Sequence, residues 1–103
     1  MLKHILQTRK TRQELANILN TSDRDVRRQI QELRESGYIV HADTDGKGYC
    51  IAHTDFERNQ TRRLFDSRLE SEISTRYAMF GYEDTREFLV KQLAIVDERV
   101  KYD

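Results

Sequence analysis

Several residue types are scarce in this 103-residue chain, which has no proline, no tryptophan and only four glycines. This composition favours helices and disfavours a turn-rich β-sandwich or barrel. The single cysteine, Cys50, excludes an internal disulfide and a thiolate metal cluster. Apolar runs of a few residues are too short to span a bilayer, and residues 1–10 are too polar for a signal peptide. We therefore expect one small cytoplasmic protein without a membrane partner.

An excess of charge of either sign is also missing, because 18 Lys and Arg balance 18 Asp and Glu. The balance excludes a polybasic or polyacidic tail, so any nucleic-acid surface must be local. Residues 1–53 hold nine basic and seven acidic residues, whereas residues 54–103 hold nine and eleven. The first half is therefore the better candidate for binding an anion.

Apolar residues at helical spacing predict three short helices before Gly37. The residues in question are Leu2, Ile5 and Leu6, then Leu15, Ile18 and Leu19, then Val26, Ile30 and Leu33. Gly37 is a suitable end for the third helix, because the residue past a helix often has a positive φ angle. Residues 38–42 and 49–53 are rich in β-branched and aromatic residues, so they predict a β-hairpin around residues 43–48.

A second helical pattern follows His53. It has one apolar stripe before Gly81 and another in a last helix from about Glu83 to Val100. The stripes consist of Phe65, Leu69, Ile73, Tyr77 and Phe80, and of Phe88, Leu89, Leu93, Val96 and Val100.

The third predicted helix, residues 23–36, has a basic face opposite its apolar line. Helices two and three are separated by a few residues only, which is short enough for a helix-turn-helix. Arginine suits the edge of guanine, and glutamine can pair with adenine. Thr21 or Ser22 can cap the helix where its N–H groups meet a phosphate. The candidate DNA contacts of this segment are Ser22, Arg24, Arg27, Arg28 and Gln31. Charged residues also commonly do no more than solvate an exposed helix, and the acidic residues of this helix favour that alternative.

The hairpin strengthens the DNA-binding interpretation. A strand pair directly after the third helix, with Lys47 in a glycine-containing tip, is typical of the wing of a winged helix. We expect wing residues 43–48 to contact the DNA backbone through Lys47, although a lysine in a loop can also serve solubility alone.

The stretches TRQELANILN (11–20) and DRDVRRQIQELRESGYIV (23–40) resemble the winged helix-turn-helix of biotin-repressor-type regulators. The following GKGYCIA (46–52) is similar to small winged-helix proteins of phages and prophages of Gram-positive bacteria. The resemblance implies binding to double-stranded DNA, with the third helix in the major groove and Arg27 and Arg28 at basic positions. Residues 81–103 resemble no family that we can name.

Residues 54–103 form a helical extension with more apolar surface than a small winged domain can cover. Two arrangements would cover this apolar surface: the last helix folds back through Gly81 within one chain, or the extension pairs with a second subunit. We predict a homodimer through residues 54–103, which would double the contacts on two DNA half-sites.

Catalytic and metal-binding patterns are weak in this sequence. His41 and Cys50 would be neighbours across the hairpin, but His53 would point to the opposite face, so we predict no metal. Carboxylates alternate with arginines as in surface ion pairs, which does not suit an acid–base catalyst, so we predict no enzyme activity, cofactor or small-molecule ligand.

The sequence therefore predicts a mainly α (α+β) winged helix-turn-helix with a two-stranded wing in residues 1–53 and a helical extension in residues 54–103. The predicted function is double-stranded DNA binding, as a transcriptional regulator or replication accessory of phage or prophage type. The alternative is an adaptor that binds another protein through the winged domain or the helical extension, without binding DNA. The zero net charge and the acidic second half of the chain favour it.

Overall fold

The computed structural model describes residues 1–43, 45 and 48–102 of the chain. It divides into two compact units, Met1–Leu64 and Phe65–Asp103, which are described separately below.

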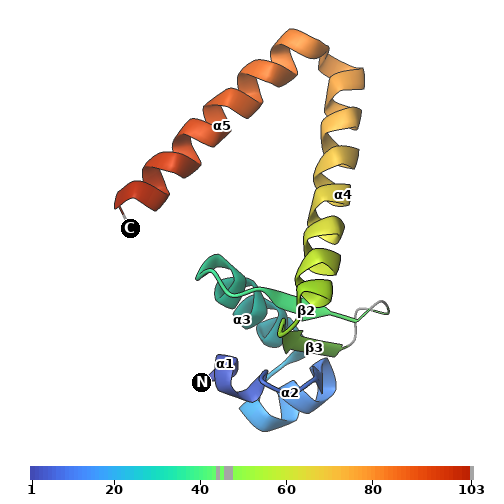
Figure 1. The fold of residues 1–103 in the computed structure, drawn as a ribbon, viewed down its shortest axis with the longest axis vertical. Helices are drawn as coiled ribbons and strands as arrows, with labels where there is room; N and C mark the ends of the chain where they lie inside the picture. Colours follow the sequence, from blue (N-terminus) through green and yellow to red (C-terminus); the bar gives the residue numbers. More distant parts are fainter. Residues whose placement is uncertain (44, 46–47, 103) are drawn as a thin grey trace. The chain divides into compact units, whose positions relative to one another are not determined.

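The first unit contains three helices and a three-stranded sheet, and it ends within a fourth helix (Figure 1). Its elements are α1 (Leu2–Ile5), β1 (Lys10–Thr11), α2 (Arg12–Leu19), α3 (Asp23–Glu35), β2 (Val40–Ala42), β3 (Gly48–Ile51) and the start of α4 (Asp55–Phe80). The sheet is antiparallel in the order β1-β3-β2. This arrangement confirms the predicted fold class and adds β1, which no sequence pattern indicated because two residues are too few to show a period.

Side chains cap the two central helices. Thr11 and Glu14 form a capping box at the start of α2, and Asn20 ends this helix with a φ angle of 52°. Ser22 caps α3, whose end is followed by Gly37 at φ 100°, as the sequence predicted. These local signals fix the lengths of both helices independently of the rest of the fold.

The core of the first unit lies between the helices and the hairpin. Its buried apolar residues are Leu2, Leu6, Leu15, Val26, Ile30 and Val40. Ile18 differs from the prediction, because 53% of its surface is exposed while Leu15 on the same helix has none. The apolar arc of α2 is wider than the face that the core covers, and Ala16 packs inward in place of Ile18.

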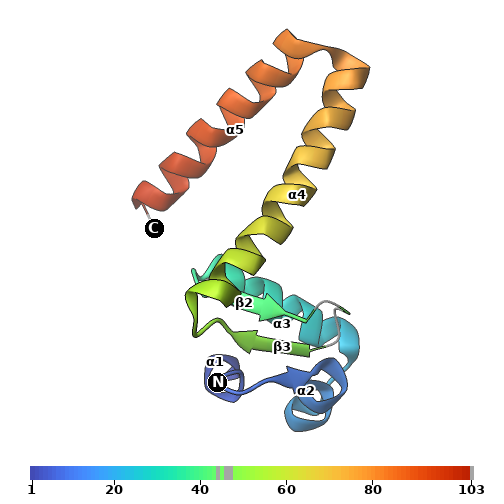
Figure 2. The same cartoon turned by 45° about the vertical axis from the view of Figure 1, so that its right-hand side comes forward.

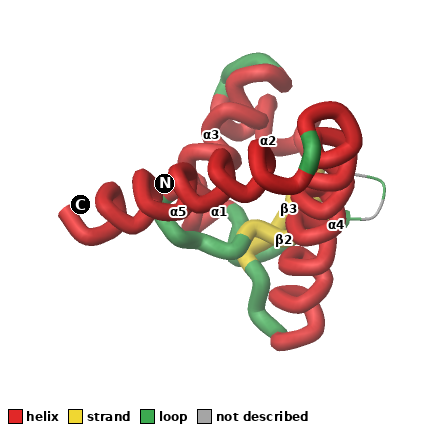
Figure 3. The backbone as a smooth tube through the Cα atoms, turned by 90° about the horizontal axis from the view of Figure 1, so that it is seen from above, coloured by secondary structure: helices red, strands yellow, loops and turns green. Residues whose placement is uncertain are grey.

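The hairpin has the register that brings His41 opposite Cys50, and Ala42 opposite Tyr49. Its strands, yellow in Figure 3, contact α3 through β2. The guanidinium of Arg34 on α3 donates to the Val40 carbonyl at 2.7 Å. This bond ties the third helix directly to the first strand of the hairpin.

The second unit consists of the rest of α4 and of α5 (Tyr82–Tyr102), joined at Gly81. Gly81 has a φ angle of +85°, a conformation that favours glycine, and the chain reverses there (Figure 2). Arg76 holds the corner, since it forms an ion pair with Asp84 at 2.8 Å and its guanidinium lies 4.7 Å from the ring centre of Phe88. The interruption predicted at Gly81 is therefore confirmed.

Candidate nucleic-acid interface

The exposed face of α3 carries the polar residues that the sequence singled out. Val26 and Ile30 are buried against the core. On other sides of the helix the structure exposes Arg24, Arg27, Arg28 and Gln31. α2 packs against α3 across a turn of three residues, so that these side chains form one surface on a helix fixed by the core.

Of the two residues that could cap α3, Ser22 is the cap, while the Thr21 hydroxyl donates to the Asp25 carboxylate at 2.8 Å. The Ser22 Oγ accepts a hydrogen bond from the Asp25 N–H at 3.1 Å, and its own hydroxyl proton remains available as a donor. The start of α3 also carries Asp23 and Asp25, whose carboxylates oppose an approaching phosphate.

Carboxylates on the same helix hold two of its arginines. The Nε of Arg27 lies 3.0 Å from Asp23. Arg28 donates through Nε to Asp25 at 2.9 Å and through Nη1 to Glu32 at 2.5 Å. The exposed cations of α3 are therefore partly neutralised by their own neighbours in the helix.

Arg24 differs from Arg27 and Arg28. It is exposed and has no hydrogen-bond or ion-pair partner within the described ranges. Gln31 donates to Glu35 at 3.1 Å, a bond between exposed neutral and charged groups that a base edge can replace. Among the described residues, Arg24 is thus an exposed α3 cation whose charge no carboxylate neutralises.

Asp25 is the centre of the polar network on α3. Hydrogen bonds from Arg28, Gln29 and Thr21 lower the pKa of this carboxyl from its ordinary 3.8 to about 2. The same contact raises the pKa of the Arg28 guanidinium. The network fixes the position of Arg28 on the helix surface at neutral pH.

The sequence reasoning missed Arg12, a further cation beside the start of α3. Its Nε lies 3.3 Å from Asp23, so that Asp23 sits between Arg12 of α2 and Arg27 of α3. Arg12 is the first residue of α2, but its proximity to α3 depends on how the two helices pack. Because no spacing in the sequence encodes the packing of two helices, no sequence signal pointed to Arg12.

The base of the wing is held by an ion pair between Arg9 and Asp43, with Nε of Arg9 2.6 Å from the carboxylate. A Cβ on Gly48 would lie only 2.7 Å from the guanidinium carbon of Arg9. Glycine at this position therefore lets the ion pair lie across β3. Lys47, the predicted backbone contact, lies outside the described residues.

His41, His53 and Cys50 have separate hydrogen-bond partners. His41 Nδ1 lies 3.2 Å from the Thr61 hydroxyl, whose proton goes to the Glu57 carbonyl, so Nδ1 is the donor. His53 Nε2 lies 2.9 Å from the Gln7 carbonyl. Among the described residues no group of three or more His, Cys, Asp or Glu is placed to hold a metal ion.

Glu57 joins the hairpin to α4. Its carboxylate accepts hydrogen bonds from the backbone N–H of His53 at 3.0 Å and of Thr54 at 3.2 Å, which lower the pKa of this group. The Cys50 thiol lies 3.6 Å from the same carboxylate, and burial raises the pKa of that thiol. These contacts make the start of α4 part of the first unit.

None of the helices within the described ranges has the length and apolar character needed to cross a membrane.

The first unit has the features of a winged helix-turn-helix domain. Two helices are joined by a short turn, the second of them has an exposed polar face, and a β-hairpin follows it in the chain. Residues 1–49 match the model of a protein family described as "HTH domain". The match supports a helix-turn-helix domain in these residues, and with it DNA binding. No curated protein and no solved structure matches the chain.

Proposed function

We propose that this protein is a transcriptional regulator that binds double-stranded DNA, with α3 in the major groove and wing residues 43–48 on the DNA backbone. The observation that carries the proposal is the exposed polar face of α3 on a helix held by a buried core. The match of residues 1–49 to the helix-turn-helix family supports the same function. The role is one of binding and not of catalysis.

Within this proposal the residues of α3 have different roles. Arg24 forms no ion pair with a carboxylate among the described residues, which suits a phosphate contact. Arg28 is held by Asp25 and Glu32 in a fixed position, which suits bidentate recognition of a guanine edge. Ser22 and Arg27 lie beside them for contacts to the backbone, and Gln31 for a contact to adenine.

The experiment first selects bound duplexes from a random pool and then measures binding to a selected and a scrambled duplex over a series of salt concentrations. Arg28→Ala should cost about 1–3 kcal/mol on the selected duplex only. Arg24→Ala and Lys47→Ala should weaken both duplexes alike and reduce the salt slope by about one each.

Arg63→Ala is the matched control, because it removes the same charge from an exposed position on α4. It should leave the discrimination between the two duplexes unchanged. Duplex binding that survives the combined Arg24, Arg28 and Lys47 alanine substitutions would contradict the proposed DNA interface.

We also propose that the protein binds DNA as a homodimer through residues 54–103. The stripe predicted on α4 is exposed in the single chain, with 56% of Leu69, 52% of Tyr77 and 60% of Phe80 accessible. Apolar surface of this extent favours association. Sedimentation of the full chain should give twice the mass of one chain, and a folded monomer at high micromolar concentration would refute the dimer.

An adaptor that docks on another protein is the alternative, favoured by the same exposed surface. It predicts no duplex selected from the random pool. The biotin-repressor type, the phage or prophage origin, the replication role and the cytoplasmic location stay predictions from the sequence.

A further inference from the structure

One face of α5 has the spacing of a coiled-coil seam. Intervals of four, three, four and three residues separate its members, which are Tyr82, Arg86, Leu89, Leu93 and Val96. Residues at these intervals lie on one side of a helix and face a partner helix along its length. Tyr82 and Leu93 are 64% and 70% exposed, so the described part of the chain does not cover this face.

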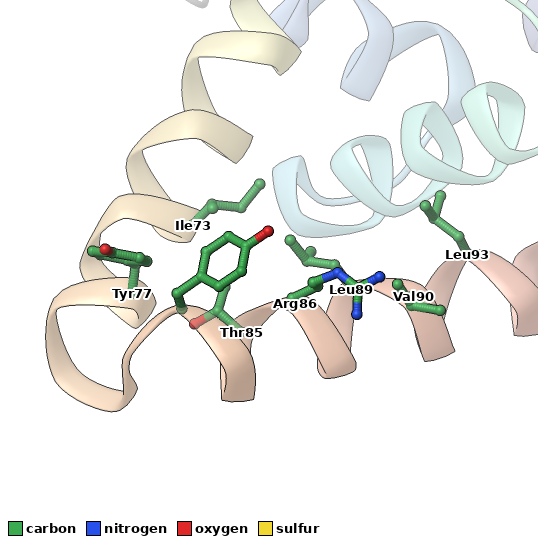
Figure 4. Close-up of a pocket in the computed structure, with 8 residues that line it drawn as sticks. Ile73, Tyr77, Thr85, Arg86, Leu89, Val90 and Leu93 are labelled. Carbon is green, nitrogen blue, oxygen red and sulfur yellow. The ribbon is translucent and has the colours of Figure 1, made fainter.

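The same face lines an open groove of about 360 Å³ at the corner between α4 and α5 (Figure 4). Ile73 and Tyr77 of α4 form its other side, and its lining is almost entirely apolar. The Tyr77 and Tyr82 rings, which both line the groove, meet edge to face with their centres 6.5 Å apart. The groove therefore combines an apolar wall with a helix seam that no helix within the described ranges covers.

We propose that α5 of a second copy of this chain lies antiparallel to α5 along this seam. The proposal rests on the homodimer of the proposed function and names the surface that forms it. In a symmetric dimer each copy presents the same face, so the two-fold axis passes between the two helices, perpendicular to both and near their middle.

The charges along α5 specify the antiparallel direction. An antiparallel alignment that places Leu93 opposite the partner's Leu89 also places Arg86 opposite the partner's Val96, beside the partner's Asp97. Arg86 and Asp97 are both exposed, and neither has an ion-pair partner among the residues that the structure describes. A parallel alignment would instead place Arg86 against the partner's Arg86, two like charges inside the seam.

Exposed apolar surface lies on the seam itself. Three of its members, Tyr82, Leu93 and Val96, are 64%, 70% and 51% exposed. An antiparallel partner helix covers these side chains in both copies at once, and association gains free energy in proportion to the apolar area removed from water.

A charge-reversal experiment on the full chain tests the pairing. Arg86→Asp and Asp97→Arg each place like charges at both symmetric contacts, so each variant alone should dimerise about tenfold more weakly. A mixture of the two variants should form heterodimers, because every contact then joins opposite charges. Lys91→Asp is the matched control, since Lys91 lies on the opposite side of α5 from the seam and its reversal should leave the dimer unchanged.

Native mass spectrometry with one isotopically labelled variant counts the homodimers and heterodimers, and circular dichroism confirms that each variant is helical. Preferential heterodimers support the antiparallel seam. A dimeric wild-type chain whose two reversal variants dimerise normally and mix at random would overturn the seam and leave the homodimer intact. A monomeric wild-type chain would refute both the seam and the homodimer, while DNA binding would be judged by the duplex experiment alone.

Discussion

Replacing Leu15 with alanine should destabilise the first unit far more than replacing Ile18, three residues further along α2. Leu15 is fully buried, whereas Ile18 is 53% exposed. Leu15→Ala removes three buried carbon groups at about 0.8 kcal/mol each and leaves a cavity, which together cost about 3–4 kcal/mol. Ile18→Ala loses about half of that transfer term, leaves no enclosed cavity and gains helix propensity, so it should cost about 0.5–1 kcal/mol.

The size of the unit makes this difference easy to measure. A unit of 64 residues has a free energy of unfolding of about 3–10 kcal/mol. Leu15→Ala therefore removes a large share of it, while Ile18→Ala removes little. The assay should follow methyl resonances of Val26 and Val40 during urea denaturation, since both side chains lie in the core and report on the first unit alone.

Equal losses for Leu15→Ala and Ile18→Ala would refute this reasoning. They would mean that α2 is rotated about its axis so that both residues face the core. The position of α3, which packs on α2, would then also be in question.

Three further predictions concern single residues. Because the pKa of Asp25 is lowered, its contribution to stability is present above pH 3.8 and is lost as the pH falls toward about 2. Asp25→Asn should therefore abolish this part of the acid destabilisation. An NMR titration of Asp25 with a midpoint near pH 4 would contradict this prediction. Burial raises the pKa of Cys50, which lowers the fraction of reactive thiolate at neutral pH. Alkylation of Cys50 should therefore be slower in the folded chain than in urea, and equal rates would exclude the burial of this thiol. Gly81→Ala places a Cβ on a residue with a φ angle of +85°, which is strained for any residue with a side chain. The substitution should therefore destabilise the α4–α5 corner by about 1–2 kcal/mol, as measured by thermal denaturation. An unchanged midpoint of thermal unfolding would mean that the backbone at residue 81 has a different conformation.

Local signals in the sequence determined most elements of this protein. The capping residues Thr11 and Ser22 and the glycines at 37 and 81 act within a few residues of themselves, so the helix ends they mark could be read before any fold was known. The basic face of α3 is equally local, because helical spacing alone separates Arg24 and Arg28 from the apolar line.

Only the tertiary structure decided which of these side chains are buried or ion-paired and which are exposed. Ile18 lies outside the core because the core contacts α2 through Leu15, Ala16 and Leu19, and Arg12 meets Asp23 only where two helices pack. Burial and ion pairing between elements depend on distances in space that no sequence interval specifies. For the same reason the stripes on α4 and α5 were readable as apolar, but their exposure in one chain became visible only in the structure.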